Sequence, residues 1–223
     1  DYMHAARVIE MYRALGDGQL PVRWSENFGY GYGMPLFEFY APLPYYVGAA
    51  FHWFGLEVLT VVKLLFLFSA IFTAWGSYKL GGRFFGHSGA ILTAAAITLA
   101  PYRAVNLFVR GALSEAWGIM AMPWVLIGIL QIVKREKNGW KTLTISLVVL
   151  MLSHNIMTML FVPLSLLFTV LFLGYRKWIV HRNKNSELET LLRVSGSLLL
   201  ATGLSSFYLF PALLEKNLTK VES

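Results

Sequence analysis

Long apolar blocks constrain this chain more than any other feature of its sequence. About 20 apolar residues are needed for a helix to cross a bilayer. Hydrophobic residues make up 57% of the chain and charged residues 14%, whereas soluble domains contain about 45–50% and about 25%. The sequence therefore predicts an all-α fold, a polytopic transmembrane helical bundle in residues 57–223. The expected spans are at about residues 57–79, 88–101, 116–133, 142–155, 156–174 and 191–210.

Residues 1–56 form a different kind of unit, a long first outer loop with two interfacial helices. In the first helix, Asp1 and His4 fall on the apolar arc, where an unpaired carboxylate would be costly. Glu10 falls on the other side, so we expect it to be a solvated partner of Arg7 or Arg13. The second helix is apolar but too short to span. The two helices are predicted at residues 1–15 and 45–54.

Loop charges predict the orientation. If residues 57–79 run inward, the inner loops hold ten of the 19 Lys and Arg residues, all close to span ends. Nine of the 12 acidic residues then lie outside. Because positive residues resist translocation, we expect an integral protein of a bacterial or archaeal plasma membrane with residues 1–56 outside. The net charge of +7 is spread over short runs between apolar blocks, which indicates topology signals and no nucleic-acid partner.

The chain begins with Asp1 and carries no cleavable signal pattern. Since something must insert it into the membrane, we expect an upstream membrane helix. The sequence contains no cysteine, which excludes disulfide and thiolate chemistry within it.

The predicted topology gathers ionisable residues from three outer segments on one face. Carboxylates can accept a proton from an incoming hydroxyl, and arginines can clamp a phosphate through two parallel hydrogen bonds. Such a set at the membrane surface indicates group transfer from a phosphorylated lipid. The candidates are Asp1, His4, Arg7, Arg103, Arg110, Glu115, His154 and Asn155.

Each candidate also has a structural interpretation. Asp1 and His4 could cap a surface helix, interfacial arginines can snorkel to head groups, and Arg110 could simply pair with Glu115. His154 and Asn155 could form a polar turn between two apolar spans.

The sequence shows no convincing motif for binding a zinc ion or a nucleotide. The histidines do not form an HExxH pattern, and the Gly-Tyr loop at residues 28–33 lacks the lysine of a phosphate-binding loop. A divalent cation could lie between Asp1 and Glu115, although no ligand pattern supports a metal site.

Several blocks in order carry a resemblance to a known family. The chain resembles the bacterial and archaeal membrane proteins labelled pyruvoyl-tetrahydropterin-synthase-related, and those proteins are similar to the GT-C class of membrane glycosyltransferases. The matching blocks are Asp1-x-x-His4-x-x-Arg7, Leu20-Pro-Val-Arg-Trp24, Phe28-Gly-Tyr-Gly-Tyr-Gly-Met-Pro35, Phe39-Tyr-Ala-Pro-Leu43, Ala100-Pro-Tyr-Arg103, Val109-Arg-Gly-Ala-Leu-Ser-Glu115, Leu152-Ser-His-Asn155 and Phe210-Pro-Ala-Leu-Leu-Glu215.

This resemblance implies roles for the candidates. Asp1 matches the acid that follows the first span and would be the catalytic base that activates an acceptor hydroxyl. Glu115, with Arg103 or Arg110, would lie near the phosphate of a polyprenyl-phosphate sugar donor. Tyr2 stands where some relatives carry a second acid. The first span and the C-terminal part of a GT-C protein would lie outside this sequence.

The expected function is therefore transfer of a sugar from a polyprenyl-phosphate donor to an acceptor hydroxyl at the outer face. One alternative is a transporter or flippase for lipid-linked envelope precursors, for which Lys63 is the best intramembrane charge. The other is a non-catalytic membrane scaffold, in which Asp1 would be dispensable.

Overall fold

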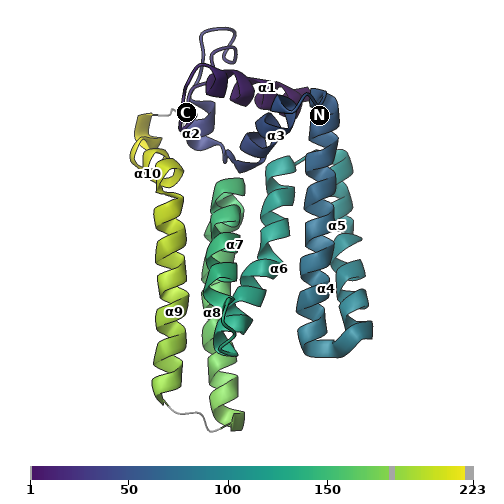
Figure 1. Ribbon diagram of the computed structural model, residues 1–223, viewed down its shortest axis with the longest axis vertical. Coiled ribbons are helices and arrows are strands. Elements are labelled where there is room, and N and C mark those ends of the chain that lie inside the picture. Colours follow the sequence, from purple (N-terminus) through teal and green to yellow (C-terminus); the bar gives the residue numbers. More distant parts are fainter. Residues whose placement is uncertain (1, 181–183, 219–223) are drawn as a thin grey trace.

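The computed structural model describes residues 2–180 and 184–218, and every regular element in these ranges is helical. Three helices lie across one end of the bundle, which is called the upper end because it is uppermost in Figure 1. They lie within residues 1–56, for which the sequence predicts an outer loop with two interfacial helices, and one of the three is a short helix that the sequence did not predict. The three are α1 (Tyr2–Gly16), α2 (Leu36–Phe39) and α3 (Leu43–Trp53).

The next segment, α4 (Val58–Thr98), is a helical hairpin. At Gly86, φ is 68° and ψ is −165°, a conformation that is essentially restricted to glycine. The chain reverses there at the lower end of the bundle (Figure 1). The arms pack so closely that a side chain on Gly81 would overlap Thr93. The first two predicted spans are therefore the two arms of one hairpin.

The ascending arm ends in a break at Ala100, after which α5 (Pro101–Ala104) and the π-helical turn η1 (Val105–Val109) lead to the upper end. From there α6 (Leu113–Val133) descends through the middle of the bundle. It packs against both α4 and α7 (Gly139–Ser153). At Gly128, the backbone of α6 approaches that of α7 at Leu143.

The last helices run down and up beside this core. The chain turns sharply at His154, which has an extended backbone, as the sequence predicted. It continues in α8 (Asn155–Val180), α9 (Lys184–Leu204), α10 (Ser206–Leu214) and the short 3-10 turn η2 (Lys216–Leu218).

Within the described residues, three helices are long and apolar enough to cross a membrane, namely Val58–Thr98, Leu113–Val133 and Asn155–Tyr175. The number rises to four if Glu187–Leu204 and Ser206–Leu214, which are bent by 74°, form one broken span. The predicted span at residues 142–155 corresponds to α7, which has 15 residues. The predicted span at residues 191–210 crosses the bend at Ser205. The structure thus supports an integral membrane protein with three or four candidate spans in its described residues.

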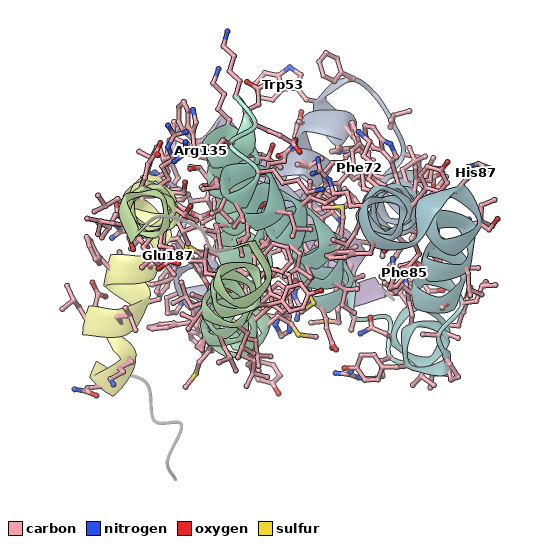
Figure 2. All side chains as sticks on the ribbon, turned by 90° about the horizontal axis from the view of Figure 1, so that it is seen from below. Trp53, Phe72, Phe85, His87, Arg135 and Glu187 are labelled. Atoms are coloured by element: carbon pink, nitrogen blue, oxygen red, sulfur yellow. The ribbon has the colours of Figure 1, made fainter. Side chains whose placement is uncertain are left out.

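Ion pairs tie the helices together at the lower end. Arg83 lies 2.8 Å from Glu136, which joins α4 to the α6–α7 loop. Arg135 lies 2.9 Å from Glu189 of α9, and the view from below places Arg135 close to this helix (Figure 2).

Candidate functional site

The backbone between α4 and α6 is irregular where the candidate arginines lie. Ala100 is extended, and the turn at Val105–Val109 has π-helical hydrogen bonding. Single π turns occur often at functional sites because they redirect side chains within a helix. Here the turn separates Arg103 from Arg110.

Glu115 lies in the first turn of α6, where the helix dipole favours a negative charge. One carboxylate oxygen lies 2.9 Å from Arg110, and the other accepts a hydrogen bond from the Tyr102 hydroxyl. Its side chain is 6% exposed. Glu115 is therefore a buried carboxylate that is charge-paired and held on both oxygens.

Arg103, unlike Glu115, is buried without a side-chain bonding partner in the described part of the chain. It is 2% exposed, and none of its three guanidinium nitrogens has a hydrogen-bond partner among the described residues. Asn106 is 1% exposed, and its amide oxygen and nitrogen also lack partners in this part of the chain. Asn106 follows Arg103 by three residues, so this short segment buries two unsatisfied polar side chains. A buried cation without a counter-charge is costly, and an anion beside it would remove that cost.

His4 joins α1 to this region. Its Nε2 donates to the carbonyl of Gly111, and its Nδ1 lies 2.9 Å from the Tyr45 hydroxyl. Burial lowers the pKa of His4 from 6.5 to about 4, so the ring is neutral at pH 7. Because both ring nitrogens bond within the protein, His4 is suited to positioning α1 against the loop that precedes Glu115.

Arg7 lies one turn further along α1. It donates to the hydroxyls of Tyr40 at 3.2 Å and Tyr45 at 3.4 Å. Its guanidinium carbon also lies 4.3 Å from the centre of the Tyr40 ring. Arg7 therefore shares Tyr45 with His4, and its positive charge stays on the upper end of the bundle.

His154 and Asn155 contribute differently. Gly118, one turn after Glu115, packs closely against the β-carbon of His154, which places His154 on the Glu115 face of α6. Asn155 donates to the carbonyl of Phe39 at 3.1 Å. The Tyr208 hydroxyl lies 2.8 Å from the Asn155 side-chain oxygen and 3.1 Å from the same carbonyl. Asn155 thus ties α8 to α2 and to α10.

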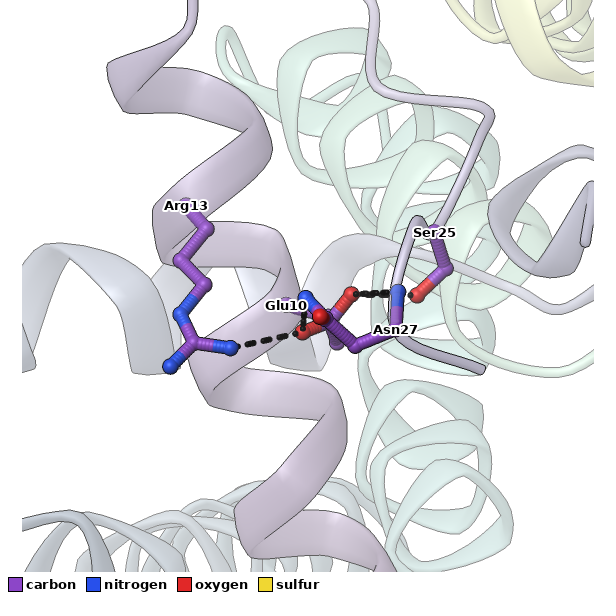
Figure 3. Close-up of polar contacts among 4 residues, drawn as sticks. All are labelled: Glu10, Arg13, Ser25 and Asn27. Atoms are coloured by element: carbon purple, nitrogen blue, oxygen red, sulfur yellow. Dashed lines mark hydrogen bonds and ion pairs between the residues drawn. The ribbon is translucent and has the colours of Figure 1, made fainter. Parts of the chain in front are cut away.

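Asp1 lies outside the described residues, so its role as a base stays a prediction. Glu10 departs from the sequence expectation. It pairs with Arg13 at 3.3 Å as expected, but the residue is 5% exposed instead of solvated. It accepts hydrogen bonds from Ser25 at 3.0 Å and from the side chain of Asn27 at 2.7 Å (Figure 3).

These contacts determine the charge state of Glu10. Burial alone would raise its pKa, but the bonds from Asn27 and Ser25, together with Arg13, lower it below the ordinary value. Glu10 therefore anchors the loop after α1 as a carboxylate, because that loop folds back over it.

Sequence reasoning missed the tyrosines that organise the site. Tyr45, Tyr102 and Tyr208 each bond to a predicted candidate. In a membrane protein, tyrosines are also common at the interface, so their presence gave no specific signal. For Tyr102, its position next to Arg103 in an Ala-Pro-Tyr-Arg block was the available hint.

Among the described residues, no group of three or more His, Cys, Asp or Glu side chains is arranged to hold a metal ion.

The long apolar helices and the polar upper end define an integral membrane protein with a candidate site at one end of its bundle. The family described as "6-pyruvoyl-tetrahydropterin synthase related domain; membrane protein" matches residues 37–223, and the chain belongs to this family. A protein of Lactococcus lactis subsp. cremoris (strain MG1363), named "Uncharacterized protein", is 27% identical over 218 residues. The match covers 93% of this chain and 34% of that relative, so the chain spans about a third of its length. No solved structure matches the chain.

Proposed function

We propose that the whole protein is a glycosyltransferase that uses a polyprenyl-phosphate-linked sugar and transfers the sugar to an acceptor hydroxyl at the upper face. The observation that carries this proposal is buried Arg103, whose guanidinium lacks a counter-charge among the described residues. A phosphate oxygen is the ligand that a planar guanidinium matches best. The resemblance to the GT-C class supplies the sugar and the lipid.

The chemistry has a simple charge balance. As the acceptor oxygen attacks the anomeric carbon, the bond from that carbon to the phosphate oxygen breaks, and negative charge collects on the leaving phosphate. A fixed guanidinium at that position stabilises the transition state more than the ground state. The acceptor proton goes to a carboxylate, and Asp1 is the proposed base. Glu115, neutralised by Arg110, would orient the donor.

The test is sugar transfer by the full-length protein in proteoliposomes that contain labelled polyprenyl-phosphate sugars. Removing one charge-stabilising donor typically lowers kcat by about 10²–10³, so we expect such a loss for Arg103→Gln. Asp1→Asn should abolish transfer while leaving donor binding unchanged. Arg135→Gln is the matched control, because Arg135 is an exposed arginine at the opposite end. Full transfer by Arg103→Gln would refute the phosphate assignment.

One observation favours a second candidate, a flippase. The 74° break between α9 and α10 is the kind of broken helix that transporters use at substrate sites. The same vesicles separate the two functions, because a flippase moves labelled lipid across the bilayer without breaking the sugar–phosphate bond.

A further inference from the structure

A concave apolar site lies on the bundle, separate from the charged cluster. It is a groove of about 530 Å³ between α4 and α7, with α6 as its floor and α3 over its upper end. In the view from below, Phe72 marks its α4 side (Figure 2). The lining is almost wholly apolar and includes Phe68, Phe72, Trp75, Trp117, Trp124 and Val149.

The depth of the groove indicates what can fill it. One side of the groove belongs to α4 and its floor belongs to α6, two helices that are long and apolar enough to span a bilayer. An apolar concavity at this depth faces lipid chains instead of water. A single flexible hydrocarbon chain is the natural occupant of a narrow site with aromatic walls.

Lys79 places a positive charge beside one part of the groove. Its ammonium lies 4.3 Å from the centre of the Trp75 ring and 5.4 Å from that of Trp124, two residues that line the groove. No carboxylate among the described residues pairs with Lys79. From Val58 to Lys79 the helix rises about 31 Å, close to the thickness of the hydrocarbon core. Arg83, one turn further along α4, pairs with Glu136 at the lower end of the bundle, so we infer that the Lys79 side chain reaches toward the head groups of the lower leaflet.

The groove is distinct from the proposed transfer site. Trp117 lines the groove, while Glu115 lies two positions earlier on α6. Two residues correspond to about 200° of rotation, so Glu115 faces the other side of the helix. A lipid in the groove would enter from the leaflet at the lower end, whereas the charged cluster lies at the upper end.

We propose that this groove binds one acyl chain of an anionic phospholipid from the lower leaflet, whose head-group phosphate contacts Lys79. The Trp75 and Trp124 rings hold the ammonium by cation–π contacts and form the wall for the first part of the chain. Such a lipid fills the space between α4 and α7 and fixes their separation. This proposal does not depend on the transfer reaction.

The test uses quenching of tryptophan fluorescence by bromine atoms on lipid chains. The full-length protein is placed in nanodiscs of unlabelled phosphatidylcholine, and dibrominated phosphatidylglycerol or dibrominated phosphatidylcholine is titrated in. The double variant Trp75→Phe/Trp124→Phe supplies the background from the remaining tryptophans. From the quenching of these two residues, we expect dibrominated phosphatidylglycerol to bind with an apparent affinity about fivefold higher than that of dibrominated phosphatidylcholine. A fivefold ratio corresponds to the ~1 kcal/mol that one lysine contributes near a charged surface.

Two variants make the result specific. Lys79→Gln should remove the preference for the anionic lipid, and Val149→Phe, which fills the groove, should remove the quenching itself. Leu167→Phe is the matched control, because Leu167 is 52% exposed on α8 and does not line the groove. Equal affinity for both lipids would overturn the anionic assignment. Quenching that is absent in the wild type, or that survives Val149→Phe, would overturn the site.

Discussion

At the scale of single residues, His4 shows how burial sets a charge state at the upper end. It is 2% exposed and its pKa is lowered from 6.5 to about 4 by burial. Below pH 6.5 the unfolded chain binds a proton that the folded protein does not, so folding stability falls as the pH drops from about 6.5 to about 4. At about pH 4 and below, this pKa shift lowers the free energy of unfolding by about 3 kcal/mol.

The expected result is a steep loss of thermal stability of the full-length protein between pH 7 and pH 4.5, and a shallower loss in His4→Gln. Unfolding temperatures at the two pH values measure this directly. Parallel pH profiles for the two proteins would show that the His4 proton is not linked to folding.

Replacing Arg103 should affect stability in the opposite direction to replacing an ordinary structural arginine. Because its guanidinium lacks a partner among the described residues, Arg103→Met removes a buried charge at no loss of a hydrogen bond. We expect the unfolding temperature of the ligand-free protein to stay equal or rise, while binding of a polyprenyl phosphate weakens. Glu115→Ala is the comparison and should destabilise by about 1–3 kcal/mol, since Arg110 and Tyr102 lose their acceptor. A large fall in the unfolding temperature of Arg103→Met would contradict the assignment.

At the scale of elements, the hairpin at Gly86 depends on one backbone conformation. With φ at 68° and ψ at −165°, an L side chain there costs about 1–3 kcal/mol. Gly86→Ala should therefore destabilise the hairpin by about that amount in a chemical unfolding experiment. Gly174→Ala serves as the control, because it lies in a helix with open space around its α-carbon. Equal effects of the two substitutions would show that Gly86 is not specifically required.

The elements also show what the sequence could and could not predict. The apolar arc predicted α1 within a residue at each end, and the polar turn at His154 was found because it interrupts an apolar run. The bend at Ser205 was missed, since apolar residues continue on both sides of it. Glu10 was assigned to solvent because helix periodicity cannot show that residues 25–27 return to cover it. The π turn before Arg110 likewise has no signature in composition.

At the scale of the whole molecule, the two ends of the bundle should lie on opposite sides of the membrane. The sequence contains no cysteine, so single cysteines introduced in this segment report their own position once any others in the full-length protein are replaced. We expect Tyr30→Cys, in the upper loop, to react with a membrane-impermeant maleimide in intact cells. Lys137→Cys, at the lower end, should react only after permeabilisation. Labelling of both positions in intact cells would contradict the predicted crossing.

The contact between Tyr208 and the carbonyl of Phe39 joins positions 169 residues apart. At about 5–20 residues per second, a ribosome needs roughly 10 to 30 s to make the intervening chain. For that interval the segment around Phe39 is already synthesised but lacks the hydroxyl that will hold it. The bond that ties Phe39 to α10 can therefore form only after Tyr208 has been made, late in the synthesis of this segment.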